Sequence, residues 1–182
     1  MPLRVDNVHS LVTLTHLPIG LTSLECSNCP SLTALGPLPA TLTSLSVFRC
    51  PLLTALPPLP PGLQFLYCNH CSSLRRLPVL PLGLIYLNCN ASAVESLGQL
   101  PIGLQHLYCH NVPQLVSLGI LPPGLWYLTA DAHIRRPDTR PPGVIMGFGG
   151  FSAAWQRKVR VQHALDRTAV AAYLSADALQ FV

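Results

Sequence analysis

Charged side chains are scarce in this sequence. Only 10% of its 182 residues are Asp, Glu, Lys or Arg, and its seven acidic residues are scattered over the whole chain. Cys109 and His110 are adjacent, so on a strand they would point to opposite faces and could not form a nucleophile–base pair. We therefore predict no catalytic site, and polarity must come mainly from Ser, Thr, Asn, Gln and the backbone.

The sequence also lacks a long apolar run, although 49% of its residues are hydrophobic. No stretch approaches the ~20 residues that span a bilayer, and 19 prolines would interrupt such a helix. The N-terminus, MPLRVDNVHS, has no continuous apolar segment of the kind found in signal peptides. We expect an intracellular protein, in the cytoplasm of its own or of a host cell, whose seven cysteines are thiols or metal ligands rather than disulfides.

Basic residues are nearly absent from most of the chain. Seven of the eleven Lys and Arg residues come after position 131, whereas residues 1–131 carry four basic and four acidic side chains. A neutral body binds polyanions poorly, because affinity for phosphates needs several cations on one surface. Contact with nucleic acid or a membrane is therefore expected only through C-terminal residues such as Arg157, Lys158 and Arg160.

What the sequence does contain is a repeat. Leu-Pro opens six units at steps of 21, 21, 21, 20 and 21 residues, and a partial unit precedes them from about Met1. Each unit follows the pattern L-x-x-L-x-C-x-x-C-x-x-L-x-x-L, which matches the leucine-rich repeat with Cys at the third apolar position and at the Asn/Cys position. One unit cannot bury its own leucines, so only a stack of units is stable. The units begin at Leu17, Leu38, Leu59, Leu80, Leu100 and Leu121.

This repeat predicts a leucine-rich-repeat solenoid over residues 1–131. The L-x-x-L-x-C segments form strands, and stacked units pair them into a parallel β-sheet on the concave face. Twenty-one residues leave no room for a helix, so L-P-x-L-P is expected to form an extended, polyproline-like convex side. Thr41 replaces glycine in one unit and predicts an altered turn there. In the other units a glycine precedes the strand, and a positive φ is expected at Gly20, Gly62, Gly83, Gly103 and Gly124.

The cysteines are predicted to belong to the core rather than to a metal site. They share their positions with Val47, Ala130 and Val112, and packing tolerates such replacements whereas zinc ligation does not. The two C-x-x-C pairs are two units apart, ~9–10 Å, which is too far to share one ion. The remaining alternative is a zinc site made by Cys68, Cys71 and a neighbour such as Cys50, with His70 expected to point outward. The strand position holds Cys26, Cys68, Cys89 and Cys109, and the next inward position holds Cys29, Cys50 and Cys71.

These units resemble two groups of known proteins. The L-P-x-L-P-x-x-L-x-x-L pattern resembles the short leucine-rich repeats of type III secreted bacterial effectors. The Cys-substituted form is similar to repeat proteins encoded by large DNA viruses of amoebae and by some protists. The resemblance covers residues 1–131 and implies a viral or effector-like protein-interaction module. Some of those effectors carry a C-terminal ubiquitin-ligase domain with a catalytic cysteine, but this chain has no cysteine after Cys109.

The aromatic residues of the repeat region occupy the strand positions that alternate with the inward ones. Six of the seven lie there, and only Trp126 does not. Because Leu and Cys already fill the core, these rings are expected to be exposed on the concave face as rigid anchors among Asn, Ser and His. The alternative is that they only stabilise the sheet, through pairs such as Phe65–Tyr86. We predict a non-catalytic protein-binding site, without cofactor or small-molecule substrate, at Phe48, Phe65, Tyr67, Tyr86, His106, Tyr108, His110 and Tyr127.

The end of the chain has a different character. Residues 132–150 are rich in Arg, Pro and Gly and are predicted to be an irregular connector. Residues 151–182 are predicted to be helical, with Ser152 as N-cap. Three roles remain open for them: a cap over the last unit, a docking or basic contact segment, or a disordered tail. As a docking segment they would make the protein a substrate adaptor that recruits ubiquitin machinery.

Overall fold

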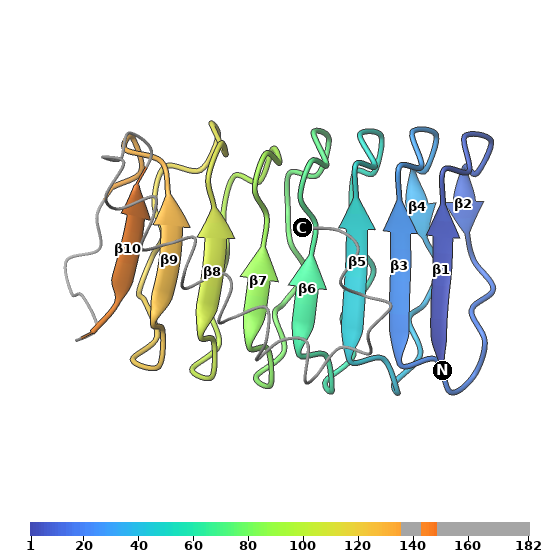
Figure 1. Ribbon diagram of the computed structural model, residues 1–182, viewed down its shortest axis with the longest axis horizontal. Helices are drawn as coiled ribbons and strands as arrows, with labels where there is room; N and C mark the ends of the chain where they lie inside the picture. The colour runs from blue at the N-terminus through green and yellow to red at the C-terminus, as the bar shows by residue number, and fades with distance from the viewer. Residues whose placement is uncertain (136–142, 149–182) are drawn as a thin grey trace. The chain divides into compact units, whose positions relative to one another are not determined.

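The structure is a computed structural model, and it describes residues 1–135 and 143–148. Its main element is a parallel sheet of eight strands in the order β1-β3-β5-β6-β7-β8-β9-β10 (Figure 1). The predicted parallel-sheet solenoid is confirmed. The strands are β1 (Pro2–Asp6), β3 (Ser23–Ser27), β5 (Ser44–Phe48), β6 (Phe65–Tyr67), β7 (Tyr86–Asn88), β8 (His106–Cys109), β9 (Tyr127–Ala130) and β10 (Ile145–Phe148).

The register of this sheet follows the repeat. Leu3 in β1 is aligned with Leu24 in β3, and Leu24 with Leu45 in β5. The same leucine row continues through Leu66, Leu87, Leu107 and Leu128. From Leu24 onward every member of the row is buried. The period of the sequence thus sets which side chains stack, because each strand meets its copy in the next coil.

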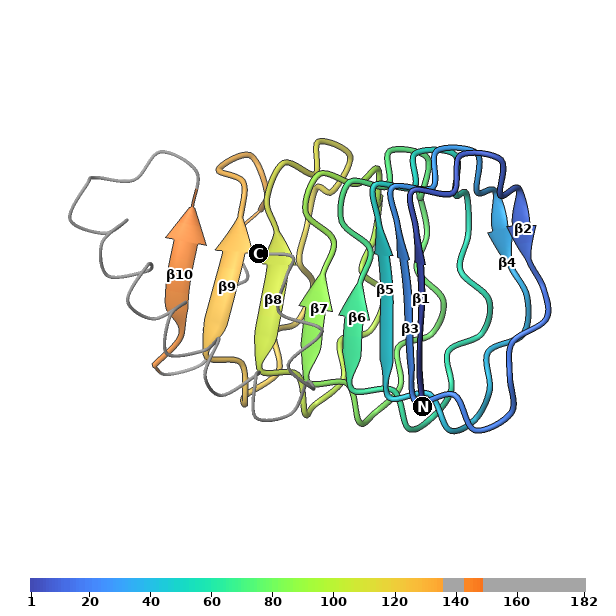
Figure 2. The same cartoon turned by 45° about the vertical axis from the view of Figure 1, so that its right-hand side comes forward.

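The side opposite the main sheet is made of short extended pieces. Strands β2 (Thr13–Leu14) and β4 (Ala34–Leu35) pair in parallel, and Figure 2 shows them across the solenoid from β1 and β3. Isolated parallel bridges join Arg76 to Ser96 and Ser117 to Arg135. No residue of the described part is helical, in line with the short return path that the period allows. Nor does that part contain a helix long and apolar enough to cross a membrane.

The core fills the space between these two sides. Leucines and cysteines of successive coils form one buried cluster, and all seven cysteines are free and buried, as predicted. Their thiols donate hydrogen bonds to backbone carbonyls of adjacent coils, for example from Cys71 Sγ to Val47 O (3.2 Å) and from Cys109 Sγ to Thr129 O (3.1 Å). Cysteine therefore serves here as a small core residue whose weak donor satisfies a carbonyl oxygen.

The turns differ from the prediction. Of the five glycines before the strands only Gly20 has a positive φ (85°), so that prediction is wrong for Gly62, Gly83, Gly103 and Gly124. A Cβ at Gly62 would instead lie 3.8 Å from the carbonyl oxygen of Ala40 in the preceding coil. Among the other residue types, positive φ occurs in the turns that follow β1, β3, β5, β6, β7 and β8, once in each turn. The residues concerned are Asn7, Asn28, Arg49, His70, Ala91 and Asn111.

Thr41 does not alter its turn, contrary to expectation. The amide of Leu42 donates to Pro39 O at 3.0 Å, the same bond that Leu63 makes to Pro60 O in the next unit. The Thr41 hydroxyl donates to Leu21 O at 2.8 Å, one coil back. A threonine fits because its hydroxyl donates a hydrogen bond to a carbonyl oxygen of the preceding coil.

The solenoid does not end at residue 131. Strand β10 lies within residues 132–150, where an irregular connector was expected, and pairs with β9 in register, Ile145 beside Tyr127. This strand lacks the Leu-Pro start and the Cys position of the other units, so the repeat pattern could not reveal it. The predicted helical segment 151–182, with Arg157, Lys158 and Arg160, lies outside the described residues.

Candidate functional site

The outer face of the main sheet, opposite the core, carries rows of side chains set by the register. The first row runs from Ser23 and Ser44 to Phe65, Tyr86, His106 and Tyr127. The second row runs from Glu25 and Ser46 to Tyr67, Asn88, Tyr108 and Thr129. The face is therefore small and polar at β3 and β5, and aromatic from β6 to β9.

Four tyrosines on this face stack diagonally from strand to strand. The ring centroids are 4.8 Å apart for Tyr67 and Tyr86, 5.1 Å for Tyr86 and Tyr108, and 5.0 Å for Tyr108 and Tyr127. The interplanar angles are 36°, 32° and 37°, so the rings lie tilted over one another. Since they alternate between the two rows, we call Tyr67, Tyr86, Tyr108 and Tyr127 the tyrosine zigzag.

His106 connects the zigzag to a residue that the sequence analysis left out. Its ring lies 5.5 Å from that of Tyr86 and 4.7 Å from that of Trp126, the latter in an edge-on arrangement at 68°. Trp126 directly precedes β9 and lies outside the alternating pattern of the strand residues. The sequence analysis therefore did not include it among the predicted site residues. The signal that could have found it is the row it shares with Gln105 and Ile85, one residue before each strand.

The prediction that these rings are exposed is wrong for four residues. Phe65 and His106 are each 7% exposed, Tyr108 5% and Tyr127 0%, whereas Tyr67 and Tyr86 are half-buried. Stacking contributes to this burial, because each ring covers the face of its neighbour, and strand β10 flanks Tyr127. None of these rings belongs to the core cluster of Leu, Cys and Val side chains. They form a separate layer on the outer face.

Phe48 and His110 lie apart from the zigzag. The Phe48 ring meets His70 edge-on at 5.4 Å, and the Arg49 guanidinium lies 4.9 Å from its centroid. His70 is exposed, as predicted. His110 is also exposed, and its Nδ1 lies 2.8 Å from Asp131 Oδ1. The structure therefore gathers five of the eight predicted residues, Tyr67, Tyr86, His106, Tyr108 and Tyr127. Phe65 pairs with Tyr86 across the strands but makes no ring contact with it.

Polar groups follow the aromatic layer where the strands end. Asn90 Oδ1 accepts from the amide of His110 (2.7 Å), and Asp131 Oδ2 accepts from the amide of Val112 (2.9 Å). Burial alone would raise the pKa of Asp131. The backbone amides of Asn111 and Val112, together with nearby His110 and His133, outweigh it and lower that pKa. This carboxylate is thus held charged by the turn that it organises.

Burial keeps several ionisable side chains of the site and of the adjacent core in their neutral forms. Burial raises the pKa of Tyr67 to about 12, so its hydroxyl remains a neutral donor and acceptor. Burial also raises the pKa of the Cys26 and Cys71 thiols to about 12, which keeps them protonated and weakly nucleophilic. Residues 1–135 and 143–148 contain no group of three or more His, Cys, Asp or Glu arranged to hold a metal ion.

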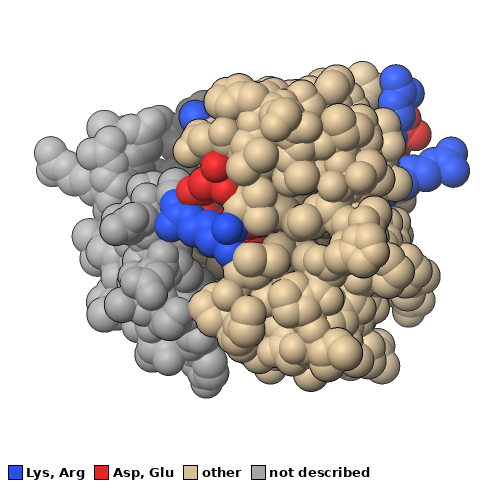
Figure 3. Space-filling model, turned by 90° about the vertical axis from the view of Figure 1, so that its right-hand side faces the viewer, with Lys and Arg blue, Asp and Glu red and all other residues tan. Residues whose placement is uncertain are grey.

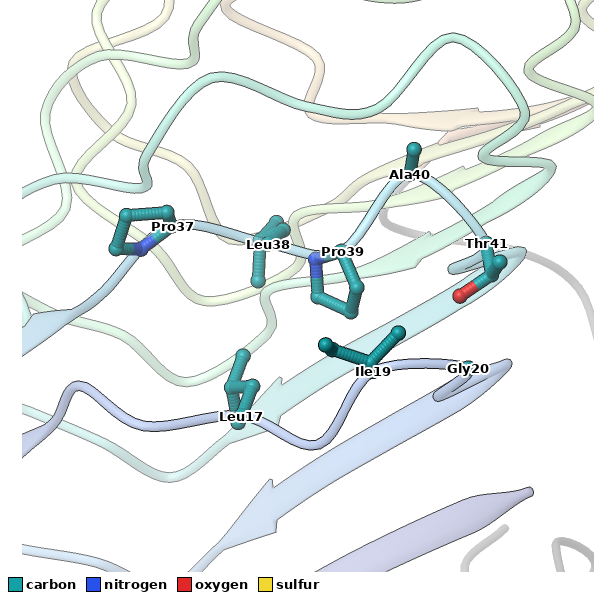
Figure 4. Close-up of a pocket in the computed structure, with 8 residues that line it drawn as sticks. All are labelled: Leu17, Ile19, Gly20, Pro37, Leu38, Pro39, Ala40 and Thr41. Atoms are coloured by element: carbon teal, nitrogen blue, oxygen red, sulfur yellow. The ribbon is translucent and has the colours of Figure 1, made fainter.

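Apart from the aromatic face, the described residues form a hollow at the Leu-Pro turns of the first two units. It has a volume of about 400 Å³, and Figure 4 shows Leu17 and Ile19 facing Pro37, Leu38 and Pro39 across it. Its Thr41 hydroxyl is already engaged with Leu21 O. This hollow is almost wholly apolar and offers no convergent polar groups, so it is a weaker candidate for specific recognition.

The fold is similar to that of YopM from Yersinia enterocolitica WA-314, a leucine-rich-repeat effector, with a TM-score of 0.59 and 30% sequence identity. The parallel-sheet solenoid of this chain therefore matches a leucine-rich-repeat fold. The match covers 74% of the chain and 34% of YopM, so the solenoid spans about a third of that protein's length. No protein-family model and no curated protein matches the chain. Leucine-rich-repeat solenoids are typically binding scaffolds without catalysis, which favours a protein-interaction role.

Proposed function

We propose that this protein is a non-catalytic module that captures a protein partner on the outer face of its main sheet. The contact would centre on the half-buried Tyr67 and Tyr86, which the buried rings of His106, Tyr108 and Tyr127 support, with Phe48, Phe65 and His110 at its margins. The observation that carries this proposal is that the aromatic layer lies outside a core that Leu and Cys already fill. Aromatic residues concentrated in this way are typical of protein interfaces.

The geometry also bears on how a partner would be recognised. Stacked rings cover one another's faces, so the accessible parts of the half-buried Tyr67 and Tyr86 would be ring edges and hydroxyl groups. A ligand that stacks flat on aromatic faces, as sugars and nucleobases do, would find few faces available. A protein surface with hydrogen-bonding groups suits edges and hydroxyls better, because tyrosine combines a rigid ring with one polar tip.

The setting of this function is a further part of the proposal. The similarity to the effector YopM supports an effector-like role, and the Cys-substituted repeat pattern supports the viral relationship. Both settings would place the protein and its partner inside a cell. The adaptor role stays a prediction, because the segment 151–182 that it requires lies outside the described residues.

The alternative is that the zigzag only stabilises the sheet, since aromatic pairs contribute ~0.5–1.5 kcal/mol each. Two triple variants at Tyr67, Tyr86 and Tyr108 separate the two roles. The Tyr→Phe variant keeps the ring stacks and removes the hydroxyls, while the Tyr→Ala variant removes both. If the face recognises a partner, both variants lose proteins that the parent chain captures in pull-downs, although the Phe variant unfolds at nearly the parent temperature.

A matched control lies in the first of the two rows. Ser23→Ala changes an outer-face residue on β3, away from the aromatic layer, and should leave capture intact. Binding of the captured protein, once purified, is then compared across all variants. Undiminished affinity in the correctly folded Tyr→Ala variant would overturn the proposal.

A further inference from the structure

The turns that follow β1, β3, β5, β6, β7 and β8 each contain one non-glycine residue in the left-handed region, and its identity varies. Asn7, Asn28 and Asn111 have φ values of 56°, 52° and 57°, and asparagine tolerates this conformation well. Arg49 and His70 have φ values of 52° and 58°. Arginine is a poor choice for such a position. Residues that violate a local preference often do so for function, provided that other features of the site agree.

Arg49 and His70 line a groove of about 390 Å³ that crosses these turns. Pro30 and Pro51, which come from successive coils, form rigid walls beside them, and His9 and Asn28 complete the lining. The Phe48 ring contacts both the Arg49 guanidinium (4.9 Å) and the His70 ring (5.4 Å). Phe48 thus contacts both nitrogen-bearing side chains of the groove.

The carboxylates of the described residues are engaged elsewhere. Arg4 lies 2.6 Å from Asp6 and 3.9 Å from Glu25. The other two pairs are Arg75 with Glu95 at 3.3 Å and His110 with Asp131 at 2.8 Å. The end of the solenoid seen in Figure 3 shows how few charges there are, since most of its described surface belongs to uncharged residues. The exposed guanidinium of Arg49 therefore has no acidic partner within residues 1–135 and 143–145.

The backbone of the groove indicates which anion it suits. Phosphate sites usually rely on free backbone amides. Here the amides of Asn28, Arg49 and His70 already donate to Phe48 O (2.9 Å), Asn69 O (3.2 Å) and Asn90 O (2.9 Å). What remains are side chains, above all the imidazole of His70 and the planar guanidinium of Arg49, whose two parallel N–H groups match the two oxygens of a carboxylate.

We propose that this groove binds a carboxylate side chain from an acidic segment of the protein partner, with Arg49 as the ion-pairing residue. The inference rests on the proposed function, because Phe48 joins the groove to the outer face that the partner would cover. It adds the chemistry of that partner: an acidic side chain placed beside the segment that contacts the tyrosine zigzag.

The test uses the full chain and a fluorescein-labelled hexaglutamate peptide, with a hexaglutamine peptide as its neutral counterpart. Arg49→Asn should weaken hexaglutamate binding at least tenfold while the unfolding temperature stays the same or rises, because asparagine suits the turn. Ala91→Asn is the matched control: it makes the same substitution at the equivalent turn outside the groove and should leave affinity unchanged. Arg49→Lys should give an intermediate loss of hexaglutamate affinity, because lysine keeps the positive charge but lacks the two parallel N–H groups of the guanidinium.

Three results would overturn this inference. They are unchanged hexaglutamate affinity in Arg49→Asn, equal binding of hexaglutamine by the parent chain, and displacement of the peptide by inorganic phosphate at far lower concentrations than by acetate. The triple Tyr→Ala variant should still bind hexaglutamate, since it leaves the groove intact. Unchanged hexaglutamate affinity in the Arg49→Asn variant would therefore refute the carboxylate site. Partner capture that survives in the triple Tyr→Ala variant would instead refute the proposed function.

Discussion

The rings of Tyr67 and Tyr86 stack with centroids 4.8 Å apart, although the sheet pairs Tyr86 with Phe65 and Tyr67 with Asn88. The contact is diagonal, from the second row of one strand to the first row of the next. Diagonal neighbours are farther apart than direct cross-strand partners, but aromatic side chains are long enough to reach them. The aromatic layer is thus coupled along the whole face rather than divided into separate cross-strand pairs.

We predict that this diagonal contact stabilises the fold measurably. A double-mutant cycle with Tyr67→Ala and Tyr86→Ala should give a coupling energy of ~0.5–1.5 kcal/mol in urea unfolding. A second cycle with Phe65→Ala and Tyr86→Ala serves as the control and should give less, since those rings make no contact. A larger coupling for Phe65 and Tyr86 would contradict the diagonal arrangement.

Two glycines should respond oppositely to alanine. A Cβ at Gly36 would lie 2.7 Å from both Cα and O of Thr15, which are backbone atoms that cannot move aside easily. Gly36→Ala should therefore lower the free energy of unfolding by ~1–3 kcal/mol. A Cβ at Gly62 would meet Ala40 O at an ordinary 3.8 Å, so Gly62→Ala should be neutral or stabilising by up to ~1 kcal/mol. Urea unfolding of both variants checks the difference, and equal losses would refute it.

The buried thiols predict a loss of stability at alkaline pH. Burial raises the pKa of Cys26 and Cys71 from 9.0 to about 12, and that of Cys50 to about 11. A raised folded pKa means that the thiol contribution is complete below pH 9.0 and is lost as pH rises toward 11–12. The unfolding temperature should accordingly decline above pH 9, and a thiol reagent should not modify the native protein at neutral pH.

A matched variant tests the thiol effect. Cys26 lies between Val5 and Val47 in the same row of the sheet, so Cys26→Val places a residue that both neighbouring coils already accommodate. Its stability at pH 7 should change by less than ~1.5 kcal/mol. Its decline above pH 9 should be shallower than that of the parent chain. An identical alkaline profile would show that the thiols are not responsible.

Acid should destabilise the turn at Asn111 and Val112, whose backbone amides donate hydrogen bonds to the Asp131 carboxylate. Its pKa is lowered from 3.8, so its contribution is complete above that value and is lost as pH falls toward the lower folded pKa. The parent chain should therefore lose stability below about pH 4 relative to Asp131→Asn, whose side chain does not titrate. Unfolding temperatures of both chains between pH 2 and 7 measure the effect. Parallel curves would exclude Asp131 as its source.

The fold could be predicted from the sequence because the pattern of leucines and cysteines repeats at a nearly constant step. Leu24, Leu45 and Leu66 recur at the repeat step and align in space for the same reason, and the cysteines follow them into the core. Features that depend on backbone conformation within one coil could not be predicted from the pattern. A glycine signals either a positive φ or close contact with the preceding coil, and only the coordinates show that Gly20 is an example of the first and Gly36 of the second.

The candidate site could be predicted only in outline. Alternation placed Tyr86, Tyr108 and Tyr127 on the outer face, but it says nothing of whether neighbouring rings cover one another. Trp126 was missed because it precedes its strand, and Arg49 because the prediction considered only strand residues. Contacts between side chains of different coils decide these points, and periodicity describes only which coils are neighbours.

The constant register of β3 through β9 has a bearing on how such a surface can change over evolutionary time. Because each coil touches only the ones before and after it, duplicating a single unit would add one rung to the face without disturbing the rest. Reach and specificity are thereby separable properties. The number of units would determine how long a ligand the protein can bind. Point substitutions on each strand would determine which residues the protein recognises in that part of the ligand.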